Sequence, residues 1–191
     1  MFLKEPNSLE ARDYLEKEET ASGYVMNLER GWAWRPDVAA SFANLRKQLS
    51  DASTLSLRER AVLACAQAQA LGDSYCATAW GTRLAELTST GTAADVLRGD
   101  EAPALSAREA ALRRWAAQVV RAPNEIQAAD IDALRSVGLT ECEIFEATAF
   151  VAFRLAFSTV NDALGARPDA QLIERAPHEV RAAITYGRPQ A

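Results

Sequence analysis

The chain has 191 residues, of which 49% are hydrophobic and 25% are charged, and its formal net charge is −5 at pH 7. This length can bury a stable core without disulfides or metals, and the acidic balance argues against nucleic acid or anionic lipid as the main partner. No apolar run approaches the roughly 20 residues needed to cross a bilayer, and the first residues lack the pattern of a secretory leader. We therefore expect a cytoplasmic globular protein that binds neither nucleic acid nor membranes.

Helix is predicted for almost every segment, because alanine is abundant and apolar residues recur at spacings of three and four. No strand is predicted, so the expected fold class is all-α. The expected helices run from Leu9 to Glu19, Pro36 to Leu49, Leu57 to Leu71, Ser74 to Thr88, Ala93 to Leu97, Ala107 to Val120, Ala128 to Val137 and Glu141 to Leu164, with a short last one from Glu179 to Ile184.

Aromatic residues gather in the segment before Pro36, which has little helical periodicity. Tyr24, Met26, Trp32 and Trp34 lie there, so we expect them in a loop ahead of the helix that Pro36 opens. Two interpretations stay open: the aromatic groups form a lid over the core, or they wall a small-molecule pocket.

Two helix starts are identical at four of five positions, Leu55-Ser56-Leu57-Arg58-Glu59 and Leu105-Ser106-Ala107-Arg108-Glu109. In each, the serine caps the first amides and the glutamate three residues later reaches back, which is the capping-box pattern. The pattern favours end caps over catalytic carboxylates for Glu59 and Glu109. The repetition also indicates two related helical hairpins.

The helix that follows the first of these boxes is rich in alanine from Val62 to Leu71, so partner helices can approach it closely. Cys65 lies inside this packing helix, which favours a core position over chemistry. The later segment from Glu143 to Leu164 is apolar around much of its circumference. It is therefore expected in the core or at a subunit contact.

The most informative segment runs from Gly72 to Gly81, because it places Cys76 in the first turn of a predicted helix. Asp73 is a good N-cap, and unpaired amides at a helix start can lower the pKa of a thiol. The same Asp73 brings a negative charge close to the sulfur, which opposes that effect. A small buried apolar cysteine therefore remains the alternative to a reactive thiol.

Other chemistries lack a signature in this sequence. The three cysteines, Cys65, Cys76 and Cys142, are odd in number and widely spaced, as is typical of a reducing compartment. The single histidine, His178, stands in a charged stretch, and no metal-ligand spacing or Gly-rich phosphate loop is present. We expect no metal and no other cofactor.

The run from Leu55 to Ala64, followed by Gly72-Asp73-Ser74-Tyr75-Cys76, resembles the core of the AhpD-like alkylhydroperoxidase and carboxymuconolactone decarboxylase superfamily. The later pieces Leu105 to Glu109, Asp130 to Arg135, Gly138 to Thr140 and Ala149 to Phe153 are similar to its peroxidase-related branch. The resemblance implies one AhpD-like multi-helical domain over residues 1–191. Its parts would be N-terminal helices (1–52), a core hairpin (55–89), a second helical half (105–165) and a tail (166–191).

In that superfamily the active site is a glutamate, a Cys-x-x-Cys at a helix start and a histidine one turn later. Cys76 matches the second, peroxide-attacking cysteine, but Asp73 stands in place of the resolving cysteine and Trp80 in place of the histidine. Ala61 occupies the glutamate position, and Glu59 lies two residues earlier. The motif is therefore degenerate.

Two functions follow from the resemblance. In the first, the protein is a peroxidase-like thiol oxidoreductase in which Cys76 attacks a small hydroperoxide, with Asp73, Tyr75, Trp80 and Glu59 as pocket or supporting residues. An external thiol would be the reductant, and Cys65 is the alternative resolving group.

In the second function, the chain has diverged, and it binds a small ligand or acts on a carbon acid as the lactone decarboxylases do. A structural role without catalysis also stays open. The resemblance further implies a homo-oligomer, either a dimer, a trimer or a hexamer.

Overall fold

The computed structural model describes residues 1–188, and within that range it contains helices and no strand. This confirms the all-α class. The helices are α1 (Leu9–Ser22), α2 (Glu29–Trp32), α3 (Pro36–Asp51), α4 (Leu57–Leu71), α5 (Ser74–Leu87), α6 (Thr90–Arg98), α7 (Ala107–Arg121), η1 (Pro123–Glu125), α8 (Ala128–Ser136), α9 (Glu141–Ala163), α10 (Ala170–Arg175) and α11 (His178–Ala183). The tail expected over 166–191 is described as far as residue 188, and its last three residues lie outside the described part.

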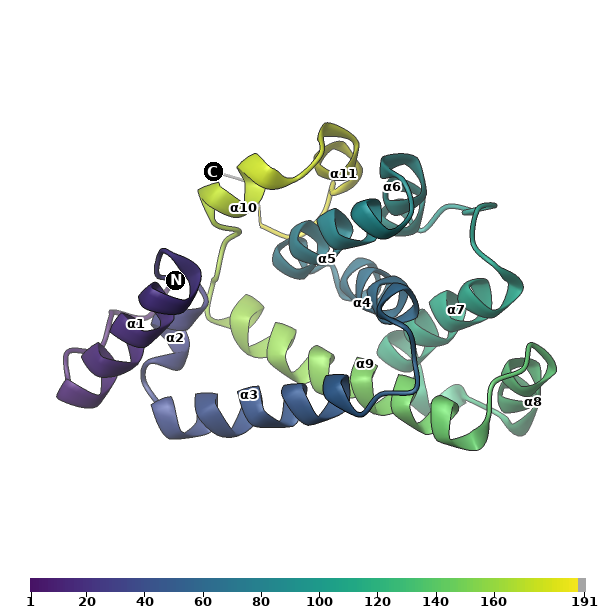
Figure 1. Cartoon of the computed structure of the whole chain (residues 1–191), viewed down its shortest axis with the longest axis horizontal. Helices are drawn as coiled ribbons and strands as arrows, with labels where there is room; N and C mark the ends of the chain where they lie inside the picture. The colour runs from purple at the N-terminus through teal and green to yellow at the C-terminus, as the bar shows by residue number, and fades with distance from the viewer. Residues whose placement is uncertain (189–191) are drawn as a thin grey trace.

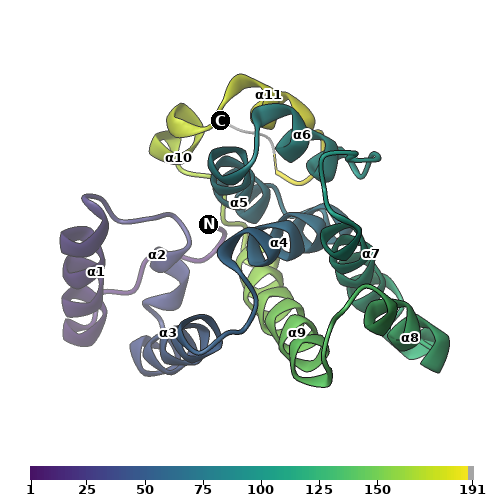
Figure 2. The ribbon, with the colours of Figure 1, turned by 45° about the vertical axis from the view of Figure 1, so that its right-hand side comes forward.

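Helix α4 lies in the middle of the bundle, as Figure 1 shows, and packs against α5, α6, α7 and α9. Its alanines separate two hydrophobic clusters, one shared with α7, α8 and α9 and the other with α5, α6 and α11. Helices α1 to α3 lie on one side of this centre, and α7 and α8 lie on the other (Figure 2). The prediction that α4 is a packing helix is confirmed, and Cys65 is fully buried in it.

Both predicted capping boxes are present, and they are linked across the α4–α7 contact. Glu59 caps the start of α4 and accepts a hydrogen bond from Arg108 at 2.6 Å. Glu109 caps the start of α7 and accepts a hydrogen bond from Arg58 at 2.5 Å. Arg108 also donates to Glu143, which forms another capping box at the start of α9, and this contact lowers the pKa of Glu143 to about 2. The two glutamates therefore act at helix ends, as predicted.

Three short elements were not expected from the sequence: α2, η1 and α10. They have four, three and six residues, so none is long enough to show helical periodicity. The expectation that Trp32 lies in a loop is wrong, because it is the last residue of α2. Helix α6 begins three residues earlier than expected because the Ser89 hydroxyl caps it.

The long helix α9 is less buried than its apolar sequence suggests. Phe150, Val151 and Phe157 face the core, but 71% of Phe145 is exposed. No helix of the described residues combines the length and apolarity required to cross a membrane. The homo-oligomer stays a prediction.

Replacing Leu63 by alanine is expected to lower the free energy of unfolding by about 2–5 kcal/mol, because the side chain is fully buried between α4, α7 and α9 and leaves a cavity. Leu9→Ala, at a position that is 72% exposed, is the control and should change it by no more than about 0.5 kcal/mol. Denaturant unfolding of both variants measures this. Equal effects would contradict the central position of α4.

Candidate functional site

The turn between α4 and α5 places Cys76 in the third position of α5. Helix α4 ends at Leu71 and is followed by its C-cap Gly72, whose φ of 82° suits glycine. Asp73 then caps α5 by accepting a bond from the Cys76 amide at 2.9 Å. The predicted cap and the helix-start position of the thiol are both confirmed. The sulfur is deeply placed, since only 5% of Cys76 is exposed.

Two side chains of α9 reach the sulfur. The Arg154 guanidinium donates to Cys76 Sγ at 3.4 Å, and the Ser158 hydroxyl lies 3.4 Å from the same atom. Arg154 and Ser158 are four residues apart and so occupy one face of α9. The cation and the hydroxyl both favour the charged form of the thiol.

Burial and a neighbouring carboxylate outweigh these contacts. Burial, followed by the negative charge of Asp73, raises the pKa of the Cys76 thiol to about 12, although Arg154 and Ser158 act to lower it. Asp73 is 1% exposed, and among residues 1–188 its second oxygen, Oδ2, has no hydrogen-bond partner. The thiol is therefore protonated at neutral pH in this structure.

Trp80 holds the arginine in place. The Arg154 guanidinium lies 4.6 Å from the centre of the Trp80 ring and 5.5 Å from that of Phe150, and the two rings meet edge to face. Such cation–π contacts restrict the guanidinium without neutralising it. At the position where the resemblance expects a proton-relaying histidine, the chain thus has a side chain that orients a cation.

Tyr75 and Glu59 have partners away from the sulfur. The Tyr75 hydroxyl donates to Asp169, which also accepts from the Asn27 amide at 2.7 Å, so this group ties the tail to the N-terminal segment. Glu59 is engaged by Ser56 and Arg108. Of the supporting residues named from the sequence, the structure brings Asp73 to the thiol, and it brings Trp80 there through Arg154.

The other two cysteines differ in their surroundings. Cys65 lies in the same hydrophobic cluster as Cys76, and burial raises the pKa of its thiol well above the ordinary value. Cys142 is exposed at the start of α9. All three are free thiols, so a resolving role for Cys65 stays a prediction.

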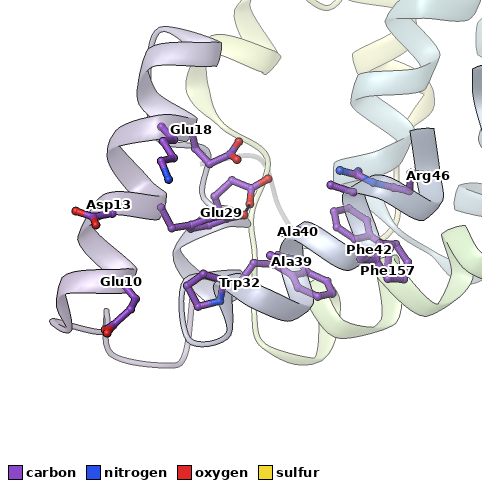
Figure 3. Close-up of a pocket in the computed structure, with 14 residues that line it drawn as sticks. Glu10, Asp13, Glu18, Glu29, Trp32, Ala39, Ala40, Phe42, Arg46 and Phe157 are labelled. Carbon is purple, nitrogen blue, oxygen red and sulfur yellow. Dashed lines mark hydrogen bonds between the residues drawn. The ribbon is translucent and has the colours of Figure 1, made fainter. Parts of the chain in front are cut away.

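The larger of two neighbouring cavities, with a volume of about 580 Å³, is shown in Figure 3. The stacked rings of Trp32, Phe42 and Phe157 line it, and Arg46 lies 4.6 Å from the centre of Phe157. Glu29 also lines it and accepts a bond from Tyr14, and burial raises the pKa of this carboxyl. Trp32 thus walls a cavity, whereas Trp34 is 52% exposed.

A second cavity of about 310 Å³ lies beside the thiol site. It is lined by Ala43, Arg46, Lys47, Leu49, Ser50, Trp80, Phe150, Phe153 and Arg154. Ala43 and Arg46 line both cavities. Cys76 lines neither, and Arg154 stands between the smaller cavity and the sulfur.

Asp162 on α9 is a titratable group that the sequence reasoning missed. Burial and the charge of Asp73 raise its pKa to about 7, while Arg188 acts to lower it. The sequence signal is that Asp162 is the single acidic residue in the mostly apolar second half of α9. Together with Gly72, Arg188 and other residues it lines a cavity of about 400 Å³ at the start of α5.

The first and last segments of the described residues come together near this point. The backbone carbonyl oxygen of Arg188 accepts a bond from the Ser74 hydroxyl at 3.1 Å, and the Arg188 guanidinium lies 4.7 Å from the centre of the Phe2 ring. Gly187 has a φ of 75°, and a Cβ there would lie 2.6 Å from the carbonyl oxygen of Gly72, so no larger residue fits. Within residues 1–188, no group of three or more His, Cys, Asp or Glu side chains is placed to hold a metal ion.

No protein-family model matches the sequence, and no curated protein matches it either. Solved structures do match. A peroxidase-related protein from Ralstonia eutropha JMP134, described as an alkylhydroperoxidase AhpD core, is 24% identical over 92% of this chain and 97% of its own, with a TM-score of 0.75. The chain has the AhpD-like fold.

Two further structures share this fold with the chain. A peroxidase-related protein from Silicibacter sp. TM1040 is 23% identical over 90% of this chain and 93% of its own, with a TM-score of 0.77. The debrominase Bmp8 is 16% identical over 95% of this chain and 94% of its own, with a TM-score of 0.70. At these identities the likeness shows the fold alone, and it confirms the resemblance at that level.

Replacing Asp73 by asparagine should speed alkylation of Cys76 about three- to thirtyfold at pH 8. Asparagine still caps α5, but loss of the charge lowers the thiol pKa by about 1–3 units, an effect that the weaker nucleophilicity of the thiolate partly offsets. Peptide mass spectrometry after iodoacetamide treatment measures the rate at each cysteine. Asp132→Asn, on the exposed face of α8, is the control, and an unchanged or slower rate in Asp73→Asn would contradict the assignment.

Asp162 is expected to make the protein less stable as pH rises from about 4 to 7. In that range the folded chain retains a proton that the unfolded chain has lost, because burial holds the pKa of this carboxyl near 7. Asp162→Asn should therefore raise the free energy of unfolding at pH 8 by about 1–2 kcal/mol, a value reduced for partial exposure, and change it little at pH 4. Denaturant unfolding at both pH values tests this, and an equal gain at pH 4 would refute it.

Proposed function

We propose that this chain is a thiol oxidoreductase in which Cys76 reduces a small hydroperoxide with the help of an external thiol. The contact that carries the proposal is the bond from Arg154 to Cys76 Sγ at the start of α5. A buried cysteine with only a packing role needs no cation aimed at its sulfur. A guanidinium there stabilises a thiolate and the anionic oxygen of a sulfenate.

The reaction needs one cysteine and two molecules of reductant. The Cys76 thiolate attacks one peroxide oxygen, the O–O bond breaks, and the alkoxide leaves as an alcohol after taking up a proton, while the sulfur becomes a sulfenic acid. An external thiol then attacks that sulfur, which releases water and forms a mixed disulfide. A second thiol cleaves the mixed disulfide and restores Cys76, so two thiols are oxidised for each peroxide reduced.

The residues around Cys76 set the rate of the first step. Arg154, which Trp80 orients, favours the thiolate, and Asp73 and burial oppose it. With a thiol pKa of about 12, roughly one molecule in 10⁵ holds the thiolate at pH 7. The proposed enzyme is consequently slow at neutral pH and faster in alkali.

The solved structures support small-molecule chemistry on this fold. Two of them are described as peroxidase-related proteins, and one is a debrominase. A cysteine-to-alanine variant of that debrominase has been solved in complex with 2,3,4-tribromopyrrole, at 16% identity and a TM-score of 0.69 to this chain. The homo-oligomeric state and the thiol reductant remain predictions for this chain.

A second candidate function is a diverged member of the fold that binds a small ligand or acts on a carbon acid without thiol chemistry. The high pKa of Cys76 favours it, as does a 580 Å³ aromatic cavity that the sulfur does not line. In that case Cys76 is a packing residue of α5, and Arg154 serves the neighbouring cavity alone.

Replacing Cys76 by serine should abolish peroxide consumption in the presence of a thiol reductant, whereas Cys142→Ser, at an exposed site, should not alter it. The wild-type rate should rise about tenfold per pH unit between pH 7 and 9, since the thiolate fraction rises by that factor below the pKa. Cumene hydroperoxide with dithiothreitol is a suitable assay, and trapping of the sulfenic acid after a peroxide pulse identifies the residue. Unchanged turnover in Cys76→Ser would favour the second candidate.

A further inference from the structure

Two arginines share the 310 Å³ cavity beside the thiol without a carboxylate partner. Arg46 enters from α3 and Arg154 from α9, and both are half-buried. Within residues 1–188 neither makes an ion pair, in contrast to Arg108, which binds two glutamates. Their described contacts are aromatic rings and the Cys76 sulfur.

Placing two unpaired guanidinium groups in one partly buried cavity costs free energy. A guanidinium does not give up its proton in a protein, so two positive charges remain close to one another in a partly dehydrated place. This repulsion affects the Arg46 guanidinium, because burial and the charge of Arg154 both lower its pKa. An anion between the two groups would remove this repulsion and provide the missing hydrogen-bond acceptors.

The walls of the cavity indicate what kind of anion fits. Trp80, Phe150 and Phe153 supply flat apolar surfaces, and no acidic side chain lines the space. Lys47 at its edge is already paired with Asp51. A volume of about 310 Å³ is at the small end for ligand pockets. The ligand must therefore be compact, with an apolar body and one acidic group.

The adjoining 580 Å³ cavity has the opposite charge pattern. Four acidic side chains line it against two basic ones, Lys17 and Arg46; the acidic residues are Glu10, Asp13, Glu18 and Glu29. Figure 3 shows Glu10 and Asp13 at the end away from Arg46. An anion is repelled there and attracted on the other side of Arg46. The charges thus assign the acidic ligand to the smaller cavity.

We propose that the cavity between Arg46 and Arg154 binds a small aromatic carboxylate, with the carboxylate between the two guanidinium groups and the ring against Phe150 and Phe153. Planar guanidinium groups match a carboxylate by paired hydrogen bonds. Arg154 contacts Cys76 Sγ and stands between the sulfur and the cavity, so the bound carboxylate shares this guanidinium with the thiol.

Calorimetry with four probes tests the binding site: benzoate, benzyl alcohol, benzylamine and inorganic phosphate. Benzoate should bind wild-type protein, and each of the other three should bind at least tenfold more weakly. Arg46→Gln and Arg154→Gln should each weaken benzoate binding at least tenfold. Arg83→Gln is the matched control, since it removes one positive charge from an exposed ion pair on α5 and should leave the affinity unchanged.

Three results would overturn the proposal: no benzoate binding, equal affinity for benzoate and benzyl alcohol, or equal affinity for benzoate and phosphate. Should a glutamine variant fail to fold, Arg46→Lys keeps the charge but loses the paired donors, and its benzoate affinity must fall. Benzoate should also slow alkylation of Cys76 at pH 9 while leaving that of exposed Cys142 unchanged. Cys76→Ser should still bind benzoate, so loss of peroxide turnover in that variant and loss of the carboxylate site are separate outcomes.

Discussion

The close approach of neighbouring helices to the alanine-rich face of α4 is the constraint on which the rest of the structure depends. Small side chains let α5, α7 and α9 pack against one helix at the same time. The turn at Gly72 and Asp73 then directs the start of α5 toward α9, where Arg154 and Ser158 stand. The position of the thiol is thus a result of how closely α4 is packed.

Local features of this protein could be predicted from the sequence, and contacts between distant segments could not. The Asp73 cap and the boxes at Ser56 and Ser106 depend on residues three apart, so the letters alone identify them. The bond from Arg154 to Cys76 joins residues 78 positions apart on different helices. Helix periodicity does not specify which arginine on α9 faces which turn.

The sequence indicates two opposing effects on the pKa of the Cys76 thiol: the helix start lowers it and the Asp73 charge raises it. The structure adds burial, whose effect exceeds both. Burial is the largest influence on the pKa of Cys76, and it depends on how α9 and the tail cover α5. Trp80, which stands where the resemblance expects a histidine, also has a structural role. The indole fixes a cation next to the sulfur, so a permanent charge stands where the resemblance places a proton carrier.

The first and last segments of the described residues meet beside α5, which has a consequence for the packing there. Phe2 and Arg188 come together from opposite ends of the sequence, and Gly187 lies against the turn that precedes the thiol. This part of the molecule is completed only when the first and last segments have both docked. The packing around the start of α5 therefore depends on residues from both ends of the described chain, and not on the central helices alone.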